Sequence, residues 1–161
     1  MRQSNAEQES YRATALAISD LKSAIGASIQ WDLINNSGES SSYVPELNSQ
    51  YIPWFQVSDP DIAQPAVQIS YVCYSYRAQD HVLLRQFISG AAPTVKQQQC
   101  DPVPEDNAKE TIVARGLLPP TPQAPLFSKD QGSGNMLIIT LRMPGVKGNV
   151  TSIVRRVHIR T

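Results

Sequence analysis

The sequence is short of the features that most directly identify a function. Its 161 residues contain no run of 18 apolar residues, so we expect no transmembrane helix and no signal peptide within the chain as given. Fourteen Lys and Arg balance fourteen Asp and Glu, which leaves no basic surplus to bind a phosphate backbone. Nucleic acid is therefore a partner that the net charge does not support. The length and the 41% hydrophobic content fit one domain.

Cysteine and histidine are also scarce. Cys73 and Cys100 are too few for a disulfide-stapled miniprotein and lack the clustered spacing of a zinc site, so one disulfide and two free thiols are the alternatives. His81 and His158 lie in segments that we predict to be strands, with no nucleophile or orienting motif around them. The acidic stretches lack the ligand spacing of a calcium loop. We therefore predict no catalytic residue, no metal and no cofactor, and thus a protein that is not an enzyme.

The first 35 residues carry the strongest periodic pattern in the sequence. Apolar residues recur there at spacings of three or four, which predicts one buried stripe along a helix. The stripe comprises Tyr11, Ala15, Ile18, Leu21, Ile25, Ile29 and Leu33. Asn35, Asn36 and Gly38 then favour a helix end, so the predicted helix runs from about residue 3 to about residue 35. Its polar start, "RQSNAEQES", has nothing to bury, and we expect the helix to continue upstream of the given sequence.

Residues 37 to 66 are interrupted by four prolines, which forbid a long helix and restrict any strand to a sheet edge. We predict a long irregular loop. Its aromatic residues are interpreted as anchors that hold the loop on the core, and the alternative is an exposed platform for a ligand. These residues are Tyr43, Tyr51, Trp54 and Phe55.

From residue 67 onward the apolar residues alternate with a period of two, which predicts strands. "VQISYVCYSY" and "HVLLRQFIS" are expected to form a central hairpin around the turn "RAQD", and "NMLIITLRM" and "VTSIVRRVHIRT" a terminal hairpin around "PGVKGN". A second long loop is predicted at 90–110. One helix followed by antiparallel hairpins predicts an α+β fold in which the long N-terminal helix packs on an antiparallel sheet.

The final segment, "RRVHIR", concentrates positive charge at Arg155, Arg156 and Arg160. Such a cluster could meet an anionic partner, whereas the simpler interpretation is a solvated strand face.

The order of these elements resembles the globular part of type IV pilin-like proteins. Within that family, the sequence is most similar to minor pilins and minor pseudopilins of the W/J type. "ALAISDLKSAIGASIQWDLINN" resembles the second half of the family's helix, with its closing pair Asp32 and Leu33. "ISYVCYSYRAQDHVLLRQ" resembles the central hairpin with its Leu83, Leu84 and Arg85, and "MLIITLRMPG" to "TSIVRRVHIRT" resembles the terminal hairpin.

The resemblance implies a structural subunit of a type IV pilus, a type II secretion system or a DNA-uptake filament, placed in the tip complex that primes assembly. A hydrophobic helix upstream of the given sequence would hold it in the bacterial cytoplasmic membrane, with the domain in the periplasm, before it joins the pilus or pseudopilus. The implied partners are other minor and major pilins or pseudopilins and the inner membrane. The alternative function is a surface binding module, such as an adhesin or a DNA-uptake receptor. An exported domain would experience an oxidising compartment, which favours the disulfide between Cys73 and Cys100.

Overall fold

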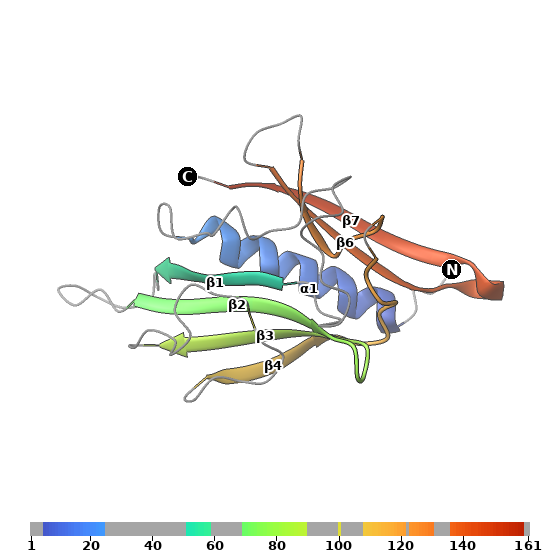
Figure 1. Ribbon diagram of the computed structural model, residues 1–161, viewed down its shortest axis with the longest axis horizontal. Coiled ribbons are helices and arrows are strands. Elements are labelled where there is room, and N and C mark those ends of the chain that lie inside the picture. Colours follow the sequence, from blue (N-terminus) through green and yellow to red (C-terminus); the bar gives the residue numbers. More distant parts are fainter. Residues whose placement is uncertain are drawn as a thin grey trace.

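The computed structural model describes residues 5–24, 51–58, 69–89, 100, 108–121, 123–130 and 136–159. This part of the chain contains one α-helix, one short 3-10 helix, η4 (Val146–Gly148), and seven strands that form two antiparallel sheets (Figure 1). The α-helix is α1 (Asn5–Lys22).

Sheet A has four strands in the order β1-β2-β3-β4. They are β1 (Tyr51–Ser58), β2 (Ile69–Arg77), β3 (Val82–Ser89) and β4 (Lys109–Ala114). Sheet B has three strands in the order β5-β6-β7. They are β5 (Phe127–Lys129), β6 (Met136–Pro144) and β7 (Val150–His158). Both hairpins expected from the alternating segments are present, β2–β3 around residues 78–81 and β6–β7 around residues 145–149.

The predicted fold class, a long N-terminal helix packed on one antiparallel sheet, is wrong. The helix has 18 residues and ends at Lys22, because Ser23 forms a turn and Ala24 pairs with Val57 in a β-bridge. Two sheets, rather than one, contribute to the core, and strands predominate among the described residues. Figure 1 shows α1 lying between sheet A and the β6–β7 hairpin, and α1 contacts β4, β6 and β7.

The buried side of α1 also differs from the predicted stripe. Tyr11 is 44% exposed and Ala15 is exposed, whereas Ile18 is half-buried and Leu21 is buried. The buried side consists mostly of small residues. It is rotated about the helix axis by about 100° from the predicted stripe, which is the angle between successive residues of a helix. Its members are Ser10, Ala13, Thr14, Ala17, Asp20 and Leu21. Ile25, Ile29 and Leu33 lie outside the described residues.

Strand β1 occupies part of the segment that we predicted to be an irregular loop. Pro53 is tolerated there because β1 is an edge strand and because its register with β2 shifts between Ile52 and Phe55. Trp54 and Phe55 are buried within this strand and are not an exposed platform. The remainder of the predicted loop, including Tyr43, lies outside the described residues.

One main hydrophobic core fills the space between the two sheets and includes the buried side of α1. Val72, Tyr74 and Tyr76 of β2 reach it from sheet A, and the alternate residues Leu137, Ile139, Leu141 and Met143 of β6 reach it from sheet B. A second cluster lies on the opposite face of sheet A and contains Trp54, Cys73, Ile88 and Cys100. Among the described residues, no helix combines the length and apolar content needed to cross a bilayer.

Candidate functional site

A buried polar network attaches α1 to sheet A. Asp20, on the buried side of α1, accepts a hydrogen bond from the Tyr74 hydroxyl of β2. Arg85 of β3 donates to the same carboxylate through both Nε and Nη2, at 2.8 Å and 3.1 Å. The register places Arg85 directly opposite Tyr74, so both side chains leave sheet A at one point and face the helix. The Arg85 guanidinium also lies over the Phe87 ring, 5.4 Å from its centroid.

This network holds the helix on sheet A. Burial, and after it the charge and hydrogen bond of Asp20, raise the pKa of Tyr74 far above its ordinary value of 10.0. Burial would lower the pKa of Arg85, but its hydrogen bond to Asp20 and the Asp20 charge outweigh burial and raise it. The Tyr74 hydroxyl and the Arg85 guanidinium therefore both donate hydrogen bonds to the Asp20 carboxylate. A buried, bidentate arginine–carboxylate pair fixes the position of the elements that carry it.

A second polar contact joins the exposed edge of α1 to the end of β4. Arg115 Nη1 lies 2.6 Å from Glu9 Oε2, with the Arg115 side chain 60% exposed. Because an ion pair this open to solvent contributes at most about 1 kcal/mol, Asp20 is the more important of the two polar contacts of the helix, beside the apolar packing of Ala13, Ala17 and Leu21 in the main core.

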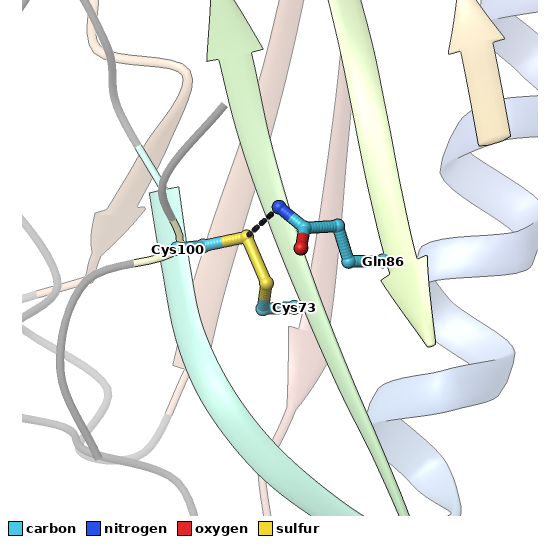
Figure 2. The surroundings of a disulfide bond; sticks show 3 residues. All are labelled: Cys73, Gln86 and Cys100. Atoms are coloured by element: carbon cyan, nitrogen blue, oxygen red, sulfur yellow. Dashed lines mark hydrogen bonds between the residues drawn. A yellow bond between two sulfur atoms is a disulfide. The ribbon is translucent and has the colours of Figure 1, made fainter. Parts of the chain in front are cut away.

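The outer face of sheet A, which points away from the main core, carries the disulfide. Cys73 of β2 is bonded to Cys100, with the two Cα atoms 5.7 Å apart. Figure 2 shows Gln86 of β3 beside this bond, and its Nε2 donates to Cys100 Sγ at 3.8 Å. Cys73 and Gln86 are cross-strand partners, which explains why the amide and the disulfide meet. Both cysteines are almost completely buried.

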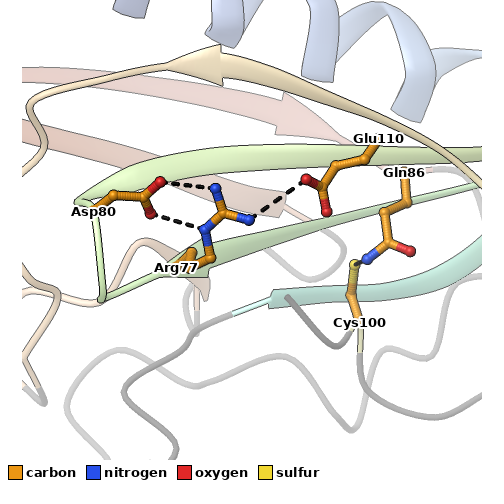
Figure 3. A network of polar contacts seen from close by, with 5 residues as sticks. All are labelled: Arg77, Asp80, Gln86, Cys100 and Glu110. Atoms are coloured by element: carbon orange, nitrogen blue, oxygen red, sulfur yellow. Dashed lines mark hydrogen bonds and ion pairs between the residues drawn. The ribbon is translucent and has the colours of Figure 1, made fainter. Parts of the chain in front are cut away.

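The same face carries a charged network, which Figure 3 shows together with Gln86 and Cys100. Arg77 donates to both carboxylate oxygens of Asp80, at 2.8 Å and 2.7 Å, and reaches Glu110 Oε1 of β4 at 3.4 Å. The hydrogen bond from Arg77 is the main cause that lowers the pKa of Asp80. Since Asp80 lies in the β2–β3 turn, the network links that turn to the edge strand β4.

Three polar atoms on this outer face lack a hydrogen-bond partner. They are Trp54 Nε1, Ser75 Oγ and Glu110 Oε2, each with its atom buried. Buried polar atoms in proteins are almost always paired, either within the chain or with ordered water. The outer face of sheet A therefore has unused hydrogen-bonding capacity next to the disulfide.

The structure describes two of the three arginines that the sequence suggests as a face for an anionic partner, Arg155 and Arg156. Arg155 pairs with Ile139, whose side chain is in the core, and Arg156 pairs with the half-buried Ile138. Successive strand residues point to opposite faces, so Arg155 and Arg156 diverge. Arg160 lies outside the described residues. Arg155 and Arg156 therefore lie on opposite faces of sheet B, and an anionic-partner face that includes Arg160 stays a prediction.

The described residues also contain no set of three metal-ligating side chains that could hold an ion. His158 is an exposed residue of β7, whereas His81 lies in the β2–β3 turn rather than in a strand, with φ of 58°. His81 Nδ1 is 3.0 Å from the Tyr76 hydroxyl, which also donates to the Leu117 carbonyl at 3.4 Å. These contacts hold the β2–β3 turn against Leu117, whose N–H also donates to the His81 carbonyl.

Sequence reasoning did not find the Asp20 network. Alternation in β3 places Arg85 on the same face as Leu83 and Phe87. An arginine among core residues could therefore have indicated a buried polar contact. Its partner, Asp20, could not be predicted from the sequence, because it is 65 residues away along the chain.

No protein-family model, no curated protein and no solved structure matches the chain. The site must therefore be interpreted from its own geometry.

Proposed function

We propose that this protein is a structural subunit of a filament, of the minor pilin or minor pseudopilin type, and that it binds sister subunits and performs no catalysis. The observation that carries the proposal is the difference between the two sides of α1. Its inner side is fixed to sheet A through Asp20, while its outer side keeps Tyr11 and Leu16 at 44% and 37% exposure. A helix that is anchored firmly on one side and open on the other is suited to contact a neighbouring subunit.

The sequence motifs support the same proposal independently of the fold class. The tyrosine-rich central hairpin and the arginine-rich terminal hairpin occur in the order of the family that the sequence resembles, whereas α1 ends at Lys22, within the segment that resembles the family's helix. The proposal requires a hydrophobic helix upstream of residue 1, which would anchor the protein in the cytoplasmic membrane before it enters the pilus or pseudopilus. Pilus, secretion system and DNA-uptake system are alternatives within it.

Deleting the gene in its native host tests this function. We expect the deletion to abolish or strongly reduce one of pilus assembly, type II secretion and DNA uptake. We expect the full-length protein to bind sister minor pilins more tightly than the given chain does, because closely packed membrane helices would add contact area.

Complementation of the deletion relates the phenotype to α1. Tyr11→Asp places a charge on the exposed side of the helix and should fail to complement, whereas Asn149→Asp, which makes the same change of charge at an exposed position of the β6–β7 turn, should complement. The proposal would be wrong if all three processes were unchanged by the deletion, or if the native gene product had no hydrophobic segment upstream of Arg2.

A further inference from the structure

The β6–β7 hairpin carries positive charge and no carboxylate. Between Met136 and His158 it contains four Lys and Arg residues and no Asp or Glu. These four are Arg142, Lys147, Arg155 and Arg156. Within the described part of the chain, only Arg156 among them has an ion-pair partner, Asp130, at 4.0 Å. Asp130 lies at the end of the hairpin opposite its turn, because its N–H donates to the Met136 carbonyl.

The turn end of the hairpin combines these unpaired cations with an exposed apolar side chain. Lys147 is exposed in the turn, and Val150, the first residue of β7, is 50% exposed. Val150 and Arg142 point away from the main core, because they alternate with the inward residues of their strands. The strand Met136–Pro144 is about 27 Å long, which exceeds the screening length of about 10 Å at 0.1 M salt. The charge of Asp130 therefore does not neutralise the turn end.

The turn of this hairpin lies at the end of the molecule where α1 begins. Figure 1 shows the hairpin projecting beyond the other described elements at that end, while α1 runs from there toward the opposite end. This inference rests on the proposed function, which places a hydrophobic membrane helix upstream of residue 1. A helix that leaves the bilayer and continues toward α1 brings the end at which α1 begins closest to the bilayer. The β6–β7 turn then faces the membrane surface.

We propose that the turn end of the β6–β7 hairpin binds the surface of a bilayer that contains anionic lipids. Lys147 and Arg142 face the lipid headgroups, and Val150 enters the interface beside them. A basic residue close to an anionic bilayer strengthens binding about fivefold, which corresponds to about 1 kcal/mol, and apolar side chains that enter the interface add to it. The contact orients the domain on the membrane and supplements the upstream helix.

Two other partners fit this end of the hairpin less well. Proteins that bind single-stranded nucleic acid stack its bases on aromatic side chains, whereas residues 136–159 contain no Phe, Trp or Tyr. A stable protein interface buries about 800 Å² on each partner, which is more than a projecting turn of five residues offers. A bilayer demands neither an aromatic platform nor a large complementary surface.

Flotation of the chain with lipid vesicles tests the proposal. We expect binding to an equal mixture of phosphatidylglycerol and phosphatidylcholine, with half of the chain bound at about 1 mM lipid, and at least tenfold weaker binding to phosphatidylcholine alone. Raising the salt from about 0.1 M to about 1 M should weaken binding at least tenfold, because the screening length falls to about 3 Å. Lys147→Glu should weaken it at least tenfold, and Val150→Ser by a smaller factor.

Lys22→Glu is the matched control, because it makes the same change of charge at the exposed last residue of α1. It should weaken binding less than threefold. Equal losses in Lys22→Glu and Lys147→Glu would overturn the proposal, as would equal binding to both kinds of vesicle or no binding at about 10 mM lipid. A chain that binds a DNA oligonucleotide or an acidic protein through Lys147, and no vesicle, would assign the hairpin to that partner and overturn it too.

A fluorescent label tests which end of the molecule meets the bilayer. Asn149→Cys and Lys22→Cys each supply one reactive thiol, since both native cysteines are in the disulfide. A polarity-sensitive dye should shift to the blue on anionic vesicles at position 149 and not at position 22, and the reverse result would overturn the proposal.

The filament function is tested separately from this contact. The upstream helix would hold the subunit in the membrane without it, so Asn149→Asp, which should weaken vesicle binding about fivefold, should still complement the deletion. Absence of vesicle binding beside a clear deletion phenotype would overturn only the lipid contact. Vesicle binding beside an unchanged deletion phenotype would overturn only the filament function.

Discussion

At the scale of single residues, Asp20 and Tyr74 are the polar groups on which the interior depends most. Asp20 has little exposure and accepts three hydrogen bonds from two side chains, and Tyr74 is completely buried. Burying a carboxylate is costly unless its partners remain charged or act as donors. The protonation state of the Tyr74 hydroxyl therefore matters, because an ionised phenolate would face the Asp20 carboxylate without a proton between them.

Alkaline titration should reveal this dependence. The pKa of Tyr74 is raised above 10.0 in the folded chain by burial and by Asp20, so the unfolded chain releases the proton first as the pH rises. The contribution of Tyr74 to stability is thus complete below about pH 10 and is lost above it, by about 1.4 kcal/mol per pH unit. We expect the difference in unfolding free energy between wild type and Tyr74→Phe to be constant from about pH 7 to 9 and to shrink above about pH 10.

Denaturant unfolding at each pH, compared between the two proteins, measures this difference and cancels the ionisation of all other groups. A difference that stays constant through the alkaline range would show that the Tyr74 hydroxyl is not held neutral in the folded chain.

At the scale of elements, α1 packs through small side chains. Ser10, Ala13, Thr14 and Ala17 form most of its buried side, which lets the helix backbone approach sheet B and the edge of sheet A closely. A hydrophobic pattern weighted toward large side chains misses such a face, because alanine, serine and threonine contribute little to it. This is why Tyr11 was expected to be buried and is exposed instead.

Enlarging this face should be more harmful than enlarging the opposite one. Ala17→Leu adds three carbon atoms at a position that is 1% exposed, and overpacking of this kind costs about 1 to 3 kcal/mol. Ala15→Leu makes the same change at an exposed position and should alter stability by less than about 0.5 kcal/mol. Urea unfolding of both variants measures the difference. Equal stability of the two would contradict the assignment of the buried side.

The sequence predicted the strands better than it predicted the helix. Period-two alternation located β2, β6 and β7, and β3 was placed as the hairpin partner of β2. In β6 and β7 the alternation follows because these strands bury one face in the main core. Strand β1 was not predicted, because a proline such as Pro53 is rare within strands. The proline is tolerated here because β1 is an edge strand and its register with β2 is irregular. The end of α1 at Lys22 was not predictable either, since the apolar pattern continues through Ile25 while Ala24 already pairs with β1.

At the scale of the whole molecule, sheet A is buried on both faces. Its inner face joins the main core with α1 and sheet B, and its outer face carries the second cluster around the disulfide. Double burial explains why β3 reads as a nearly continuous apolar run, "VLLRQFIS", in which Val82, Leu83 and Leu84 are all buried. The disulfide lies within the second cluster. The main core therefore lies on one side of sheet A, and a smaller apolar cluster that contains the disulfide lies on the other.

Removing that cross-link should lower the stability of the whole molecule. The bond closes a loop with a sequence separation of 27, and the loss of its restraint on the unfolded chain should cost about 3 to 4 kcal/mol. Cys73→Ala/Cys100→Ala should therefore melt about 10 °C below wild type in calorimetry. A reducing agent should lower the melting temperature of wild type by a similar amount and leave the double variant unchanged, because only the bond responds to it. Two thiols titrating in unreduced, unfolded protein from an oxidising compartment would contradict the disulfide, and equal melting of oxidised and reduced wild type would contradict its role in stability.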